Sequence, residues 1–282
     1  MGLPLLTSMI PSYLCRLMIF RYLFVLFIGF FMLSCERKTT AVLKGNDLDA
    51  KQKIADDYYA KKKYDKAIPI YEELLTVLKG QKSVEDIYFK YANAQYLNDN
   101  YELGAFYLKS FYNTYSLSTH AEEAAFLEAM CYYKQSPRYT LEQTSTEEAM
   151  SIFQAFINKY PNSTRMAEAN TKMDELRAKL RKKAYESAYL YYKIEQYNAA
   201  AVALRNFLKD YPEYENPEKI DYLVVKSLKY YADESTKTKK AERYKDGVTA
   251  YNEFKQKYPN SQYLDELNKM NKSTLNNLEN LQ

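Results

Sequence analysis

Few residues of this sequence are of the types that do chemistry, and they form no recognisable catalytic or metal-binding set. The chain of 282 residues has one histidine and three cysteines, whereas a structural zinc site needs four such ligands. The histidine, His120, lies in "YSLSTHAEEAA", where Ser118 or Thr119 is placed to cap a helix and no partner for catalysis is visible. The sequence also has no glycine-rich phosphate loop and no nucleophile elbow. We therefore expect no enzyme activity, no metal and no cofactor.

One cysteine does predict a modification, because it closes the only strongly apolar run, "RYLFVLFIGFFMLSCERKTT". The run from Tyr22 to Leu33 has twelve residues, which is too short for a spanning helix of roughly 20 but suits a secretory signal of about 7–15. Arg16 and Arg21 supply the positive charge that precedes such a signal. The ending "LSC" resembles the bacterial lipobox, so Cys35 is predicted to be acylated and to anchor the chain in a membrane by lipid.

Cleavage before Cys35 divides the chain. Residues 1–34 are then a signal peptide, for which Met18 is an alternative start, because "MIFRYLFVLFIGFFMLSC" is a complete signal by itself. Residues 35–49 are the lipidated cysteine and a tether, and residues 50–282 are the folded part. The alternative is an uncleaved anchor with an incidental cysteine.

The mature chain is balanced in charge and rich in helix-forming residues. Removing 34 of the 282 residues leaves 248, with 38 basic and 36 acidic side chains, which argues against a dedicated nucleic-acid binder. Cys131 is the remaining cysteine, so no internal disulfide can form, and we expect a small buried apolar residue there. Only six glycines and eight prolines are present, which is typical of long helices joined by short turns.

A repeat organises these helices. The segment "YDKAIPIYEELL" recurs as "YELGAFYLKSFY", "TEEAMSIFQAFI", "YNAAAVALRNFL" and "YKDGVTAYNEFK". Steps of four and three residues place one small and two large residues on the same face of each helix. The aligned columns are Ala67, Gly104, Ala149, Ala200 and Gly247; Tyr71, Leu108, Phe153, Leu204 and Tyr251; and Leu74, Phe111, Phe156, Phe207 and Phe254.

Partner helices precede the repeated ones. Ala55, Ala92 and Ala188 lie twelve residues before the matching small residue, so two antiparallel helices can approach closely at their crossing. This arrangement resembles the tetratricopeptide repeat, although the spacings of 37, 45, 51 and 47 residues exceed its roughly 34. We expect an all-α tetratricopeptide-repeat superhelix, right-handed, of five helix pairs with a C-terminal helix. The excess should lie between helices in "KQSPRYTLEQTSTEE" and "ADESTKTKKAER", and should lengthen the first helix of the fourth pair.

A lipobox followed by five such repeats resembles the BamD family of outer-membrane assembly lipoproteins. Three further segments carry the resemblance: "SPRYTLEQTSTEEAMSIFQAFINKYPNS", the long charged helix that ends "KKAYESAYLYYKIEQ", and the final "YPNSQYLDELNKM". The resemblance implies a non-enzymatic scaffold at the periplasmic face of the outer membrane. It also implies binding to a BamA-like barrel protein through its periplasmic domains, and to unfolded outer-membrane protein clients. The high tyrosine content and the basic "TKTKK" depart from the family pattern.

Candidate contact residues come from the first helices and from the last pair. Tyr59, Tyr91, Tyr96 and Tyr192 could line a peptide-binding groove, and the alternative for each is packing in the core. Lys226 and Lys229, one helical step apart, could form a basic patch for the barrel partner, and the alternative is an ordinary solvated surface. We accordingly expect client binding at Tyr58–Tyr115 and partner binding at about Tyr222–Leu281.

Two other functions use similar repeats. A glycan-binding surface lipoprotein usually stacks sugars on tryptophan, and this chain has none. Surface export also favours an acidic cluster after the lipidated cysteine, whereas "CERKTT" is mixed and then basic. A pilotin of envelope or pilus biogenesis is the other alternative, which the insert of the third repeat and the long helix of the fourth argue against.

Overall fold

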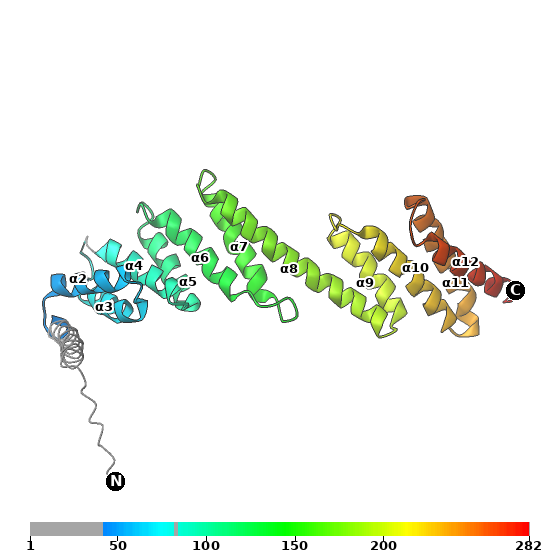
Figure 1. Ribbon diagram of the computed structural model, residues 1–282, viewed down its shortest axis with the longest axis horizontal. Coiled ribbons are helices and arrows are strands. Elements are labelled where there is room, and N and C mark those ends of the chain that lie inside the picture. Colours follow the sequence, from blue (N-terminus) through cyan, green and yellow to red (C-terminus); the bar gives the residue numbers. More distant parts are fainter. Residues whose placement is uncertain (1–41, 82–83, 282) are drawn as a thin grey trace, which may run out of the picture. The chain divides into compact units, whose positions relative to one another are not determined.

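The computed structural model describes residues 42–81 and 84–281. The predicted signal peptide and Cys35 lie outside these residues. Within the described part, every regular element is a helix (Figure 1). No described helix has both the length and the apolarity that crossing a membrane requires.

Five helix pairs and a C-terminal helix follow in order, as the repeat predicts. The pairs are α2 (Leu48–Ala60) with α3 (Tyr64–Val77), α4 (Val84–Leu97) with α5 (Tyr101–Thr114), α6 (Ala121–Gln135) with α7 (Thr144–Lys159), α8 (Met166–Lys193) with α9 (Tyr197–Asp210), and α10 (Pro217–Asp233) with α11 (Lys237–Lys257). Helix α12 (Leu264–Glu279) follows. The prediction of an all-α tetratricopeptide-type fold is confirmed.

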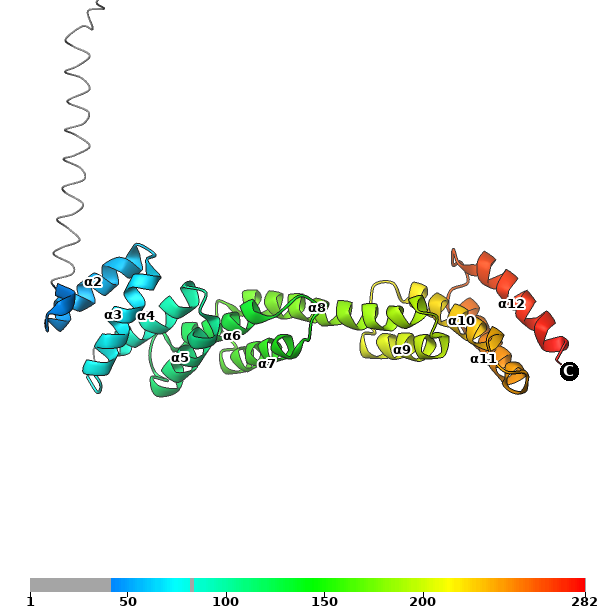
Figure 2. The same ribbon diagram turned by 90° about the horizontal axis from the view of Figure 1, so that it is seen from below.

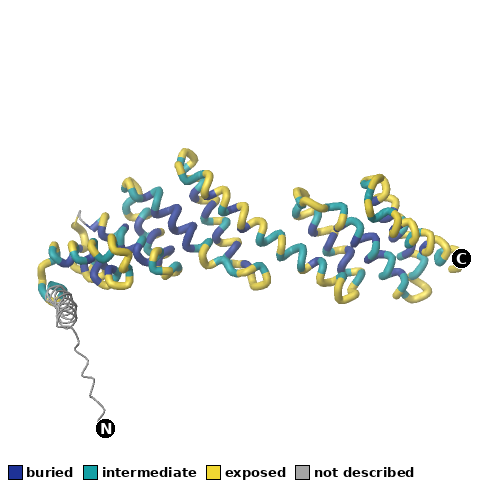
Figure 3. The backbone as a smooth tube through the Cα atoms, viewed as in Figure 1, coloured by how far each residue is buried: buried dark blue, intermediate teal, exposed yellow. Residues whose placement is uncertain are grey.

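The repeated columns form the core, which the alternation of buried and exposed positions in Figure 3 makes visible. All fifteen residues of the three columns are buried, and the small residues of the first helices, Ala55, Ala92 and Ala188, are buried with them. A small side chain at the crossing lets two helices approach, and the two large ones fill the space beside it. The sequence alignment therefore identifies the residues that hold each pair together.

Three of the turns within pairs share one conformation. Lys62, Asp99 and Glu195 each lie five residues before the small residue of their pair and have φ values of 57°, 60° and 62°. A left-handed residue at this point lets the backbone amides after it donate to the last carbonyls of the first helix. A tyrosine pair closes each of these turns, with ring centroids 5.6–6.0 Å apart: Tyr59 with Tyr64, Tyr96 with Tyr101, and Tyr192 with Tyr197.

The ends of four of the five second helices, α5, α7, α9 and α11, are also alike. The backbone amide of a tyrosine donates to the carbonyl of a phenylalanine four residues earlier, and the two rings pack together at 5.0–5.5 Å. The pairs are Phe111 with Tyr115, Phe156 with Tyr160, Phe207 with Tyr211, and Phe254 with Tyr258. This contact ends the helix at the tyrosine and directs the chain into the next pair.

The extra residues of the longer repeats lie in three different places. In the third pair they form the loop between α6 and α7, and in the fourth they extend α8 to 28 residues, both as expected. In the fifth pair the expectation of an insert between helices is wrong. Helix α11 begins at Lys237, ten residues before Gly247, because "KTKKAER" contains only residues that a helix accepts and therefore adds turns to its start.

The chain divides into two compact units, the first ending at Cys131 and the second beginning at Tyr132. In the second unit the first helices of the pairs and α12 lie on one side, and α9 and α11 lie on the other (Figure 2). Contacts between α10 and α12 agree with this arrangement. Side chains from α8, α10 and α12 can therefore share one surface.

Candidate functional site

Six tyrosines gather on the side of the second unit that α8, α10 and α12 form, and we name them the tyrosine face. They are Tyr185, Tyr189, Tyr192, Tyr222, Tyr230 and Tyr263, and each is partly exposed. The three on α8 are spaced four and three residues apart and so share one face of that helix. Five of the six pack against the hydrophobic core of the unit and remain partly accessible to solvent.

Ring contacts connect the tyrosine face across the helices. Tyr189 stacks on Tyr185 and on Tyr192, with centroid distances of 5.8 and 5.9 Å. From Tyr192 the contacts continue through Tyr197 to Tyr230, at 6.0 and 5.0 Å. On the other edge Tyr222 stacks on Tyr263 at 4.2 Å. The face therefore contains one chain of ring contacts from Tyr185 to Tyr230 and a separate stacked pair, Tyr222 with Tyr263.

An ion pair lies at the centre of the tyrosine face. The Nζ atom of Lys226 on α10 is 2.8 Å from Oε1 of Glu266 on α12, and it donates to the Tyr222 hydroxyl at 3.0 Å. The same ammonium lies over the rings of Tyr222 and Tyr230, at 5.1 and 5.9 Å from their centroids. Only 15% of the Lys226 side chain is exposed. Lys226 therefore links α10 to α12 and orients the tyrosines around it.

These contacts set the protonation of the groups. Burial alone would lower the pKa of Lys226, but its hydrogen bonds to Glu266 and Tyr222 raise it above its usual range. Lys226 and then Tyr222 hold the pKa of Glu266 below its usual range. Burial raises the pKa of Tyr185, Tyr192 and Tyr222. At neutral pH the hydroxyls of Tyr185, Tyr192 and Tyr222 are thus protonated, and Lys226 and Glu266 remain an ion pair.

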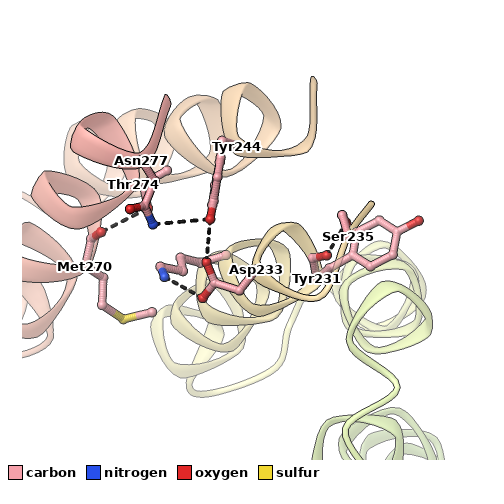
Figure 4. Close-up of polar contacts among 8 residues, drawn as sticks. Tyr231, Asp233, Ser235, Tyr244, Met270, Thr274 and Asn277 are labelled. Atoms are coloured by element: carbon pink, nitrogen blue, oxygen red, sulfur yellow. Dashed lines mark hydrogen bonds and ion pairs between the residues drawn. The ribbon is translucent and has the colours of Figure 1, made fainter. Parts of the chain in front are cut away.

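Lys229 takes part in a separate polar network between the last three helices. Its Nζ atom is 2.5 Å from Oδ2 of Asp233, and the other carboxylate oxygen accepts from the Tyr244 hydroxyl at 2.8 Å. The Nδ2 amide of Asn277 donates to the same hydroxyl at 3.2 Å, as Figure 4 shows. The lysine side chain is 15% exposed. Both predicted partner-binding lysines are thus paired within the fold.

The groove candidates of the first unit do not lie together as one surface. Tyr91 is 3% exposed and packs edge-on against Tyr107 at 4.8 Å, so it is a core residue. Tyr59 and Tyr96 close the turns of their pairs, and the Tyr59 hydroxyl accepts a hydrogen bond from Asn93 at 2.7 Å. The exposed apolar side chains of this unit include Phe106 and Leu103 on α5, at 63% and 48%. Sequence reasoning did not identify these two residues. The available signal was that both are apolar and lie outside the repeated core columns, so the repeat does not require them to be buried.

The histidine and the cysteine among the described residues have structural roles. The ring of His120 stacks on Phe89 at 4.3 Å, and its backbone amide donates to Oγ of Ser118 at 3.1 Å. Ser118 therefore contacts the residue just before α6, which begins at Ala121. Cys131 is a buried thiol. Among the described residues, no group of histidine, cysteine and carboxylate side chains could hold a metal ion.

Sequence reasoning identified two members of this site but not the site itself. It assigned Tyr192 to a peptide-binding groove and Lys226 to partner binding. The structure places both at one surface, where Lys226 offsets part of the rise that burial causes in the pKa of Tyr192. The available signal was the spacing of Tyr185, Tyr189 and Tyr192 in "AYESAYLYYK". It shows a tyrosine stripe on one helix but not the neighbours that complete the surface.

Comparisons with known proteins identify the family. A model of the YfiO family, described as outer membrane lipoprotein, matches residues 50–188 and 180–279, which is most of the chain. A search of curated proteins finds no match. Among solved structures, the complex of the TPR2AB domain of yeast Sti1 with pHSP90 matches at 12% identity and a TM-score of 0.37, over 80% of this chain and 98% of that one. The chain therefore belongs to the YfiO family of outer membrane lipoproteins.

Proposed function

We propose that the protein is a non-enzymatic scaffold of the machinery that assembles β-barrel proteins in the outer membrane. The observation that carries the proposal is the family match, which runs through both units. A fold of stacked helix pairs offers extended surfaces for other chains, and the tyrosine face is such a surface. The anchor is the lipid on Cys35, and the scaffold faces the periplasm.

We assign binding of a BamA-like barrel partner, through its periplasmic domains, to the tyrosine face. Tyrosine offers contact area and a hydrogen bond at low entropic cost, and aromatic residues are enriched where binding energy concentrates. Lys226 and Lys229 contribute by holding the face and the last helices in place, since both are paired internally. Client chains bind in the region Tyr58–Tyr115, where Phe106 and Leu103 offer apolar contact.

Capture from detergent-solubilised membranes tests the partner. The wild-type protein is expected to retain a large β-barrel protein, and Tyr189→Ser is expected to weaken the capture. Tyr191→Ser is the matched control, because Tyr191 lies on the same helix, is 44% exposed and is outside the tyrosine face. Capture of no barrel protein by the wild type would refute the scaffold proposal, and equal loss in both variants would refute the assignment to this face.

Fractionation tests the anchor separately. Cys35→Ser is expected to leave the outer-membrane fraction and to lack the mass of the acyl chains. If the variant stays in outer membranes with an unchanged mass, the lipidation of Cys35 is wrong.

A further inference from the structure

A pocket of about 140 Å³ opens between α9, α10 and α11, on the second unit. Its floor is apolar, and its rim carries four charged side chains. The floor residues are Val224, Val225, Ala250 and Phe254, and the rim residues are Arg205, Asp221, Glu253 and Lys257. The function proposed above leaves this pocket without a role.

The volume of the pocket suits one large side chain. An engineered apolar cavity of about 150 Å³ is large enough to bind benzene. All four floor residues are at least 95% buried, so the floor is held by the core and is formed before any ligand arrives. A phenyl ring or a side chain of similar size would itself leave water there and contact the small apolar surface that these residues leave exposed.

The rim has one satisfied charge pair and two charges that remain available. Asp221 is 2.8 Å from the Nζ atom of Lys257 and accepts a hydrogen bond from the Tyr258 hydroxyl at 2.9 Å. Among the described residues, neither Arg205 nor Glu253 has an ion-pair partner within 4.0 Å, and both are exposed. A ligand can therefore place an acidic group at Arg205 and a basic group at Glu253.

The pocket is independent of the tyrosine face. Asp221, Val224 and Val225 lie on one side of α10, whereas Tyr222, Lys226 and Tyr230 lie on the other, because successive residues of a helix are about 100° apart. One helix thus has a binding surface on each side.

We propose that this pocket binds an aromatic side chain within a protein segment that has an acidic residue on one side of the ring and a basic residue on the other. The ring enters the apolar floor, the acid pairs with Arg205 and the base pairs with Glu253. The inference deepens the scaffold function, and it rests on that function only for the partner being a protein.

Methyl NMR of the full-length protein in detergent tests the pocket directly. The methyl groups of Val224, Val225 and Ala250 report on its floor. The probe is the peptide acetyl-Asp-Phe-Lys-amide, and the comparison peptides are acetyl-Asn-Phe-Gln-amide, which lacks the charges, and acetyl-Asp-Ala-Lys-amide, which lacks the ring. We expect saturable shifts of the floor methyls with the probe, about three- to tenfold weaker binding of the uncharged peptide, and no shift with the alanine peptide.

Variants of the rim separate pocket binding from contact elsewhere. Arg205→Gln with Glu253→Gln should remove the preference for the charged peptide and keep the weak binding of the ring. Lys209→Gln is the control, because it removes a positive charge one turn further along α9 and outside the pocket. Ala250→Leu should fill the floor and abolish the shifts of the valine methyls, with the melting curve showing whether the unit remains folded.

Three outcomes would overturn the proposal. They are no saturable shift of the floor methyls, equal binding of the phenylalanine and alanine peptides, and an undiminished charge preference in the doubly substituted rim. None of these outcomes depends on capture of a barrel protein. A negative result for the pocket can therefore be distinguished from a negative result for the scaffold proposal.

Discussion

The Sγ atom of Cys131 lies 3.1 Å from the position that a Cβ atom on Gly104 would take. The backbone of Tyr96 is nearly as close, at 3.2–3.3 Å. Three helices, α4, α5 and α6, therefore meet at a point where any side chain larger than that of glycine would be crowded. Gly247 occupies the same column of the repeat, but its nearest neighbours would be 3.8–3.9 Å away, at the backbone of Leu228 and Lys229.

Alanine at these two glycines should therefore act in opposite directions. Gly104→Ala introduces contacts shorter than van der Waals distance and is expected to lower the free energy of unfolding by about 1 kcal/mol, since overpacking exceeds the gain in helix propensity. Gly247→Ala meets ordinary contacts and is expected to raise it by up to about 1 kcal/mol. Denaturant unfolding measures both. Equal signs would show that the two crossings are not packed as described.

The thiol of Cys131 should be unreactive in the folded protein. Burial, with a smaller contribution from Glu128, raises its pKa to about 12, so the reactive thiolate is scarce near pH 8. A disulfide reagent at pH 8 is expected to modify Cys131 only after denaturant is added. Rapid modification of the native protein would contradict this packing.

Glycine at the residues with positive φ in the turns within pairs should stabilise the protein. Lys62→Gly and Glu195→Gly are each expected to raise the free energy of unfolding by roughly 0.5–1 kcal/mol, because the left-handed conformation strains a residue with a Cβ atom. Asp99→Gly should gain less, since aspartate tolerates this conformation better. Gln196→Gly is the control, because its φ is −82° and glycine there only adds freedom to the unfolded chain. Stabilisation by the control of the same size would exclude turn strain as the cause.

The crossing of α8 and α9 should not accept a large side chain. Ala200 is fully buried, and Ala200→Leu is expected to lower the free energy of unfolding by roughly 1–3 kcal/mol through overpacking. Val202→Leu, on the same helix at a position 53% exposed, is the matched control and should change it little. A melting curve unmoved by Ala200→Leu would count against the repeat alignment.

The ion pair of the tyrosine face should make stability depend on pH. The pKa of Glu266 is lowered in the folded state by Lys226 and then by Tyr222, so the contribution is present above the ordinary carboxylate pKa of about 4.3 and is lost as pH falls through the lower, folded value. Glu266→Gln should cost up to about 1 kcal/mol at pH 7, because the carboxylate is half exposed. The difference from wild type should vanish in acid. A difference that persists below pH 3 would point to packing instead of charge.

The helix pairs were predictable because each pair is encoded locally. The small and large residues recur at fixed steps, and all fifteen are buried, so one period describes the core. The fifth pair shows where this reasoning stops. "KTKKAER" was interpreted as part of a loop, because charged residues are exposed in loops as well as on helices, although every residue in it is one that a helix accepts.

The tyrosine face was less accessible to sequence reasoning, because its contacts cross helices far apart in the chain. Tyr222 and Tyr263 stack although 41 positions separate them, and Lys226 meets Glu266 across 40. Spacing within one helix shows which residues share a face of that helix, but not which residues of another helix contact that face. Lys226 shows this limit, because its partner Glu266 lies on another helix, whereas the pairing of Lys229 with Asp233, four residues further along α10, follows a spacing that the sequence contains.

Helix α8 has a consequence for how the second unit can change during evolution. Figure 1 shows α7 along the first part of α8 and α9 along its last part, so one continuous rod of 28 residues, about 42 Å, joins the two contacts. Each added residue would advance the rod by about 1.5 Å and turn everything beyond it by about 100°. A single inserted residue would thus rotate the tyrosine face to a different direction about the axis of α8. An insertion of seven residues would nearly restore the direction and lengthen the helix by about 10 Å. Insertions in α8 would therefore keep the direction of the tyrosine face only at lengths close to whole numbers of helical turns. The length of α8 sets both the distance and the direction of that face.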